Sequence, residues 1–409
     1  MTALQNPMSV CSSYKILVLS RNYPNSVTPI LGLWVEGLAR HLSQLCDVKV
    51  IAPVPYCPPL PGLNEFTKFR SVERQRNKDG VEIFHPRFIT GPGYSTYNFE
   101  GSSYYWSIRR EVDRLREEFP FDLIHANFGY PDGVVAAKLA ARYNVPFIIT
   151  EHASWIPWMD NYPRVRRQAV RAAGLAAFHI AVSNFARQTI AHFTGETNKL
   201  RVVPNGVDVS IFKPLSNGER PNPNQILYVG FMRRVKGIDV LLEAMSRVVK
   251  QNPELKLVLV GGGVYRHSQA QEQELHEMAK KLGVEKNVEF VGVKTPLEVA
   301  EYMRESALLV LPSRAETFGA VLIEALACGT PVVATRCGGT EDIVNESVGK
   351  LVPKENAEAL ADAIVEVAAQ RHNFNSVELR DYALTNFAWE QIARQTIDLY
   401  SKAINAENN

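Results

Sequence analysis

Two glutamates and a run of backbone amides in the segment 312–331 have types and spacings that suit the binding of a nucleotide diphosphate. A strand is predicted to end just before this segment, and a helix is predicted to begin near Phe318. The first N–H groups of such a helix, on Phe318, Gly319 and Ala320, have no partner within it, so they predict an anion site that a phosphate fits. Glu324 follows about two turns later, roughly 9 Å from the helix start. A carboxylate there can bind the two adjacent hydroxyls of a ribose, and Glu316 lies in the loop before the helix.

Short β-branched runs alternate with helical patterns along the chain, which is typical of βαβ units and parallel sheets. In the first half, strands are predicted at 15–19, 48–52, 81–84, 123–126, 147–150, 179–182 and 200–203. After a linker rich in Pro and Asn at 214–225, they are predicted at 226–229, 257–260, 288–291, 308–311 and 332–334. Helices are predicted over 356–370 and 389–403. The chain is therefore expected to be an α/β protein with two doubly wound parallel sheets.

A chain of 409 residues exceeds what one hydrophobic core usually supports, so two domains of roughly 200 residues are expected. We predict an N-terminal domain at 1–215, a second domain at 216–388, and a C-terminal helix at 389–409 that crosses back to the first domain. Ligands of parallel sheets bind at the carboxyl ends of the strands, and we expect these ends to face a shared cleft.

The composition, 46% hydrophobic and 22% charged, is that of an ordinary globular protein. No apolar run is long enough to span a bilayer, and residues 1–12 lack a secretory signal, so a soluble, cytoplasmic protein is expected. Its five cysteines are odd in number and show no Cys-x-x-Cys spacing, which indicates neither a disulfide framework nor a zinc site. We interpret them as core or loop residues: Cys11, Cys46, Cys57, Cys328 and Cys337.

Charge is distributed unevenly although the net charge is only +2. Residues 1–215 carry 24 Lys and Arg against 17 Asp and Glu, a net +7, whereas the remaining residues carry 21 against 26, a net −5. The basic half favours an anionic partner, either a phosphorylated acceptor or an anionic membrane surface. Solvated charge scattered over the surface is the alternative. A helix with Arg164, Arg166, Arg167 and Arg171 is the clearest basic patch, and no nucleic-acid partner is expected.

The strand, loop, helix start and Gly-Thr-Pro stop of segment 312–331 together resemble the family 4 glycosyltransferases of the GT-B fold, and the resemblance covers nearly the whole chain. It implies two Rossmann-like domains, with 1–215 on the acceptor side and 216–388 binding the nucleotide sugar. The resemblance further implies transfer of a hexosyl unit, with retention, from a nucleotide diphosphate sugar to a glycan or lipid-linked acceptor. It also implies that Glu316 contacts the donor sugar and that Glu324 binds the ribose. The relatives include enzymes of polysaccharide and glycolipid synthesis.

The loop after residue 229 resembles the part of the family that presents cations to the diphosphate, with Lys236 six residues after Gly230. The family usually has Arg directly after this glycine, whereas this chain has Phe231, which we expect to pack beneath the loop. Arg233 and Arg234 are the possible substitutes, and we choose Arg233 because it lies on the same side of an extended segment as residue 231. Surface charge is the alternative interpretation of Lys236.

Three further positions resemble donor contacts of the family. Gly262, in the glycine turn after strand 257–260, and Val293, after strand 288–291, match the nucleotide side. Gly32 matches a helix-start glycine that lets the donor phosphate approach. Each glycine has the alternative of an ordinary tight turn.

Two polar residues follow predicted strands of the first domain and are expected at its ligand-binding edge. These are Asn127, where relatives often have His, and His152, which becomes the histidine nearest the reacting sugar. Asn127 can hydrogen-bond a sugar hydroxyl but cannot carry a proton at neutral pH. His125 is expected to be a packed strand residue.

The sequence thus predicts a retaining glycosyltransferase that needs no cofactor and no metal, since no Asp-x-Asp triplet is present to hold a divalent ion. Peripheral contact with the inner face of an anionic membrane stays open beside a purely cytoplasmic location. One alternative is a non-catalytic nucleotide-sugar binding module. A nicotinamide-dependent oxidoreductase is disfavoured because no Gly-x-Gly-x-x-Gly run follows the first strand.

Overall fold

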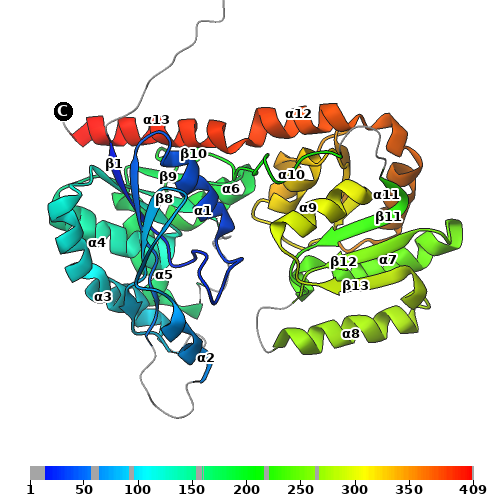
Figure 1. The fold of residues 1–409 in the computed structure, drawn as a ribbon, viewed down its shortest axis with the longest axis horizontal. Coiled ribbons are helices and arrows are strands. Elements are labelled where there is room, and N and C mark those ends of the chain that lie inside the picture. Colours follow the sequence, from blue (N-terminus) through cyan, green and yellow to red (C-terminus); the bar gives the residue numbers. More distant parts are fainter. Residues whose placement is uncertain are drawn as a thin grey trace, which may run out of the picture. The chain divides into compact units, whose positions relative to one another are not determined.

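The computed structural model (Figure 1) describes residues 14–56, 64–91, 96–152, 159, 161–215, 221–262 and 267–407. The chain divides into two compact units, of which unit 1 comprises Met1–Pro204 with Trp389–Asn409 and unit 2 comprises Asn205–Ala388. We predicted the division after residue 215, whereas unit 2 begins at Asn205. Residues 205–215 therefore belong to unit 2. Each unit is built around its own sheet.

The sheet of unit 1 has the strand order β10-β9-β8-β7-β1-β2-β5-β4. Neighbouring strands pair in parallel except for β4, which is antiparallel to β5. The strands are β1 (Lys15–Leu19), β2 (Asp47–Ile51), β4 (Gln75–Lys78), β5 (Val81–Phe84), β7 (Leu123–Asn127), β8 (Phe147–Glu151), β9 (Phe178–Ala181) and β10 (Leu200–Val202). A separate parallel pair joins β3 (Val54–Pro55) to β6 (Arg87–Phe88).

Helices cover this sheet with apolar faces at helical spacing. In α1 (Leu33–Leu42) the buried residues Val35, Leu38, Ala39 and Leu42 follow the i, i+3, i+4, i+7 pattern of an amphipathic helix. They share a core with α13 (Trp389–Glu407) and one side of the strands. The helices α1 and α13 lie next to each other in Figure 1. The other helices are α2 (Asn64–Thr67), α3 (Tyr97–Glu118), α4 (Val134–Tyr143), α5 (Pro163–Leu175) and α6 (Asn184–Thr194), with the short turns η1 (Lys68–Ser71) and η2 (Gly129–Gly133).

Unit 2 has a parallel sheet of order β13-β12-β11-β14-β15-β16. Its strands are β11 (Asn222–Val229), β12 (Lys256–Val260), β13 (Val288–Gly292), β14 (Ser306–Leu311), β15 (Val332–Arg336) and β16 (Gly349–Pro353). One side of the sheet shares a core with α7 (Ile238–Gln251) and α11 (Ala357–Ala369). The remaining elements are α8 (His267–Lys281), α9 (Pro296–Glu305), α10 (Ala320–Ala327), α12 (Ser376–Phe387), η4 (Arg234–Lys236), η5 (Glu285–Asn287), η6 (Gly339–Asp342) and η7 (Arg371–Asn373).

The predicted strands are all present, and the α/β class with parallel sheets in two domains is confirmed. The linker prediction for 214–225 is wrong at its end, because β11 begins at Asn222 and pairs there with Ser306 of β14. Residues 216–220 of the predicted linker lie outside the described residues. Four strands were not predicted, namely β3, β4, β6 and β16, and neither was the helix α12.

Three of the cysteines, Cys46, Cys328 and Cys337, are free thiols in the interior, as expected of core residues. The other two, Cys11 and Cys57, lie outside the described residues, as do residues 1–12. Within the described ranges, none of the helices combines the length and apolar character needed to cross a bilayer.

Candidate functional site

Each sheet has one place where the strand order reverses, between β1 and β7 in unit 1 and between β11 and β14 in unit 2. In open parallel sheets, ligands bind beside such a switch point, outside the carboxyl ends of the strands. Most of the residues singled out from the sequence lie beside these two places, one group in each unit, whereas Gly262 and Val293 follow the strands β12 and β13.

At the switch point of unit 2, a lysine and a glutamate form an ion pair. Lys236 Nζ lies 2.6 Å from Glu316 Oε1, and the Ser313 hydroxyl donates to the same oxygen at 2.7 Å. The side chains of Lys236 and Glu316 are 23% and 10% exposed. The cation expected at the diphosphate and the carboxylate expected at the sugar are therefore in direct contact.

Close backbone contacts bring these two residues together. Gly237 has φ 67°, and a Cβ atom there would lie 2.1 Å from the carbonyl oxygen of Pro312, so only glycine lets the loop after β11 approach the loop after β14. Glu316 is fixed from the other side, because its N–H donates to Cys337 and its carbonyl accepts from Gly339.

The start of α10 presents free amides beside this pair. Gly319 is the N-cap residue, in the left-handed conformation with φ 99°, and the helix begins at Ala320, two residues after the predicted start. No residue in the described ranges accepts a hydrogen bond from the N–H of Phe318, Gly319 or Ala320. Together with the positive end of the helix dipole, these donors can bind an anion.

Glu324 lies one turn into α10, on the same face as Ala320. Burial raises the pKa of its carboxyl group to about 8. The group is therefore mostly protonated at neutral pH before a ligand binds, and it can donate as well as accept a hydrogen bond to hydroxyl groups.

The glycine turns expected on the nucleotide side meet at neighbouring strand ends. Gly261 N–H donates to the carbonyl of Gly292 at 2.9 Å, and a Cβ atom on Gly261 would lie 1.9 Å from the carbonyl oxygen of Gly230. Gly262 lies against Val293, whose side chain is 58% exposed. The structure thus brings Gly262 and Val293 together, at the ends of β12 and β13.

The loop that carries the basic residues differs from expectation in one respect. Phe231 is only half-buried, and Met232, 1% exposed, takes the core position that we assigned to Phe231. This interpretation of Phe231 is therefore wrong: the side chain that packs beneath the loop comes one residue later. Arg233 is exposed in an extended conformation, and Arg234 is exposed at the start of η4.

At the switch point of unit 1, Asn127 and His152 are in contact. His152 Nε2 lies 3.0 Å from Asn127 Oδ1, and Asn127 Nδ2 donates to Leu19 at the end of β1. The centre of the His152 imidazole ring lies 5.9 Å from the centre of the Trp34 ring and 5.4 Å from the centre of the Phe128 ring. Phe128 has φ 97°, a strained conformation for a non-glycine residue, and such strain clusters at functional sites.

Gly32 and His125 have clear structural roles. Gly32 is the N-cap residue of α1 with φ 80°, and a Cβ atom there would lie 2.0 Å from the carbonyl oxygen of Asn22. His125 is buried, as expected, and its ring nitrogens lie 2.7 Å from the hydroxyls of Tyr400 and Thr150.

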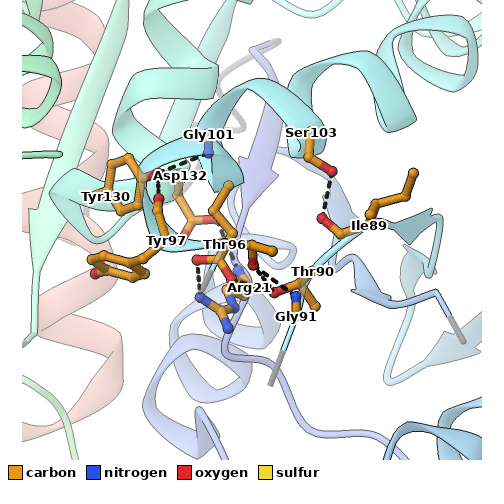
Figure 2. Close-up of polar contacts among 11 residues, drawn as sticks. Arg21, Ile89, Thr90, Gly91, Thr96, Tyr97, Gly101, Ser103, Tyr130 and Asp132 are labelled. Atoms are coloured by element: carbon orange, nitrogen blue, oxygen red, sulfur yellow. Dashed lines mark hydrogen bonds and ion pairs between the residues drawn. The ribbon is translucent and has the colours of Figure 1, made fainter. Parts of the chain in front are cut away.

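A buried polar network next to this switch point was not foreseen (Figure 2). Arg21, after β1, forms an ion pair of 2.6 Å with Glu100 of α3, and Glu100 accepts a second hydrogen bond from Thr90. The backbone N–H of Arg21 donates to Asp132. Burial raises the pKa of Asp132 well above its usual value.

The Glu100 side chain is 2% exposed, whereas that of Arg21 is 34% exposed. The network therefore orients a half-exposed guanidinium at the carboxyl end of β1. The signal in the sequence was a glutamate at helical spacing from the buried residues Tyr97, Tyr104 and Ile108, on what is otherwise an apolar face.

Comparisons with known proteins agree with these two units. Residues 32–211 match the family Glycosyltransferase Family 4, and residues 211–383 match the family Glycosyl transferases group 1. The D-inositol 3-phosphate glycosyltransferase of Saccharomonospora viridis is 30% identical over 392 residues, which cover 84% of this chain and 90% of that protein.

Solved structures show the same fold. A sucrose-phosphate synthase from Thermosynechococcus elongatus superposes with a TM-score of 0.78 at 22% identity, over 96% of this chain and all of that chain. The Anabaena protein HepE in complex with UDP-glucose gives a TM-score of 0.70 at 21% identity, over 95% of this chain and 99% of that chain. These neighbours are glycosyltransferases of the GT-B fold.

Proposed function

Because the chain belongs to family 4 of the glycosyltransferases, we propose that it moves a hexosyl unit, with retention, from a nucleotide diphosphate sugar to a glycan or lipid-linked acceptor. The observation that carries the proposal is the contact of Lys236 with Glu316 beside the free amides that begin α10. An oxidoreductase is no longer an alternative. The Anabaena protein HepE, whose structures are complexes with UDP and with UDP-glucose, supports a sugar nucleotide as donor.

In this proposal, unit 2 binds the donor. The amides of Phe318, Gly319 and Ala320 bind the diphosphate, and Lys236 and Arg233 supply positive charge.

The remaining donor contacts are assigned to the nucleoside and the sugar. Glu324 binds the ribose hydroxyls, Gly262 and Val293 lie against the base, and Glu316 contacts the donor sugar. The charge-assisted hydrogen bonds of Lys236 and Arg233 to the diphosphate contribute about 1.5 to 3 kcal/mol each. Gly32 of unit 1 is the further position assigned to the donor phosphate.

Asn127 and His152 are assigned to the reacting sugar. In the transfer step, a bond forms between the acceptor oxygen and the anomeric carbon while the bond from that carbon to the diphosphate oxygen breaks. The acceptor hydroxyl loses its proton to an oxygen of the leaving diphosphate on the same face of the sugar. Because the acceptor oxygen attacks from the same face that the diphosphate leaves, the new bond keeps the configuration of the old one, and no side-chain nucleophile is assigned to this step.

We further propose that transfer needs no metal ion. The charge of the leaving diphosphate is compensated by cations and amides of unit 2, which removes the need for an ion bound by carboxylates. In the described part of the chain, no group of three His, Cys, Asp or Glu side chains is placed to hold an ion.

The test combines donor screening with product analysis. A thermal-shift screen of UDP, GDP and ADP sugars identifies the donor, because a bound ligand raises the unfolding temperature. NMR of the product then reports the anomeric configuration, and a product of inverted configuration would refute the retaining mechanism. Donor binding without any release of nucleotide diphosphate, across glycan and lipid-linked acceptors, would instead favour a non-catalytic binding module.

A further inference from the structure

Helix α5 of unit 1 (Figure 1) carries four arginines and no acidic residue: Arg164, Arg166, Arg167 and Arg171. Arg164 lies in the first turn, where the helix dipole disfavours positive charge. Arg167 and Arg171 lie four residues apart, a spacing at which like charges repel. These arginine positions therefore lower the stability of the α5 helix itself.

Three of these arginines are exposed and line an open hollow of about 360 Å³. Its lining consists of Arg166, Arg167, Val170 and Arg171 from α5 and Phe193 from α6. The Arg166 guanidinium lies 5.3 Å from the centre of the Phe193 ring, a cation–π contact that holds it beside the hollow. The lining thus combines three arginine residues with the apolar side chains of Val170 and Phe193.

The hollow has no negative charge of its own, since its lining residues include no Asp or Glu. In the part of the chain that the structure describes, no acidic side chain forms an ion pair with Arg167 or Arg171. Some exposed arginines elsewhere do have such a partner, as Arg142 has Asp113 at 2.9 Å. Arg167 and Arg171 therefore keep donors for an external anion.

We propose that this hollow, which we call the α5 hollow, binds a phosphoryl group of a phosphate monoester or diester. The planar guanidinium group matches two phosphate oxygens at once, which favours arginine over lysine for this purpose. The same chemistry is offered by the headgroup of an anionic lipid and by a soluble sugar phosphate. The inference is independent of the donor site of unit 2 and of the residues assigned to the reacting sugar.

The experiment compares two double variants of the full chain that lose the same charge. The test variant is Arg167→Gln with Arg171→Gln. The matched control is Arg110→Gln with Arg394→Gln, two exposed arginines of α3 and α13 in the same unit. One arm measures flotation with vesicles of phosphatidylcholine, with and without phosphatidylglycerol. The other arm measures the binding of inorganic phosphate and glucose 6-phosphate by calorimetry at constant ionic strength.

If the hollow accepts lipid headgroups, the test variant loses about thirtyfold in binding to the anionic vesicles, since each cation near such a surface contributes about fivefold. The control then loses no more than about threefold. If it accepts soluble phosphates, the loss appears in calorimetry instead. Equal losses in the two double variants, or no binding by the wild-type chain in either arm, overturn the proposal. Circular dichroism verifies that both variants are folded.

Discussion

Two buried histidines should make unit 1 sensitive to acid. His125 and His179 are 0% and 2% exposed, and desolvation lowers the pKa of each from 6.5 to about 3. A folded-state pKa below the unfolded value means that the unfolded chain binds the proton first as the pH falls. The stability that the neutral histidines contribute is therefore complete above pH 6.5 and is lost progressively as the pH falls towards 3.

The size of the effect follows from these values. For one histidine, proton binding to the unfolded chain lowers the free energy of unfolding by about 2 kcal/mol between about pH 7.5 and about pH 5. The two together amount to about 4 kcal/mol, a large part of the stability of an ordinary domain. Burial also lowers the pKa of His85, which adds to the loss in the same direction.

The assay uses the distribution of tryptophan. All five tryptophans belong to unit 1, so their fluorescence during urea unfolding reports on that unit: Trp34, Trp106, Trp155, Trp158 and Trp389. Between about pH 7.5 and about pH 5, His125→Gln should lose about 2 kcal/mol less than the wild-type chain. His192→Gln, which changes an exposed histidine of α6, should follow the wild type. Coinciding pH dependences of wild type and His125→Gln would show that His125 does not titrate as inferred.

Three further predictions concern the donor site. Activity should survive EDTA, and a complete loss restored by manganese or magnesium would contradict metal independence. Glu316→Gln should lower kcat strongly and leave the affinity for nucleotide diphosphate nearly intact, whereas Glu324→Ala should weaken that affinity; calorimetry that finds equal losses would refute this division of roles. Arg233→Ala and Lys236→Ala should each lower kcat/KM about tenfold to a hundredfold, with Arg234→Ala within about threefold. Steady-state kinetics in which Arg234→Ala is damaging and Arg233→Ala is silent would reverse the choice between them.

The strands were predictable because most of them are continuous apolar runs, as expected of parallel strands buried on both faces. Strands at the edge of a sheet were not predictable in this way. The residues of β4 are Gln75, Arg76, Asn77 and Lys78, and they form a strand only because β5 offers an antiparallel partner. The start of β11 was not predicted for a similar reason. Residues 222–225 have a composition typical of a linker, and they begin a strand because Asn222 pairs with β14.

The site was predictable where one segment contains both the chemistry and its scaffold, as at Glu316 and the start of α10. The site was less predictable where a contact depends on tertiary structure. Whether Met232 or Phe231 enters the core was not predictable, because the two residues are adjacent and both are apolar. Arg21 and Glu100 are 79 residues apart, and only the fold brings them to 2.6 Å.

The ion pair of Lys236 with Glu316 sharpens the expected effect of changing the glutamate. With Glu316 ionised, the lysine shares its charge between this carboxylate and any bound diphosphate. The Lys236 Nζ to Glu316 Oε1 distance of 2.6 Å and the low exposure of Glu316 make this competition strong. Replacing Glu316 by Gln removes the competitor while keeping a hydrogen-bonding group beside Ser313. The affinity for nucleotide diphosphate should therefore stay level or rise as kcat falls, a combination that a carboxylate supporting only the folded loop would not produce.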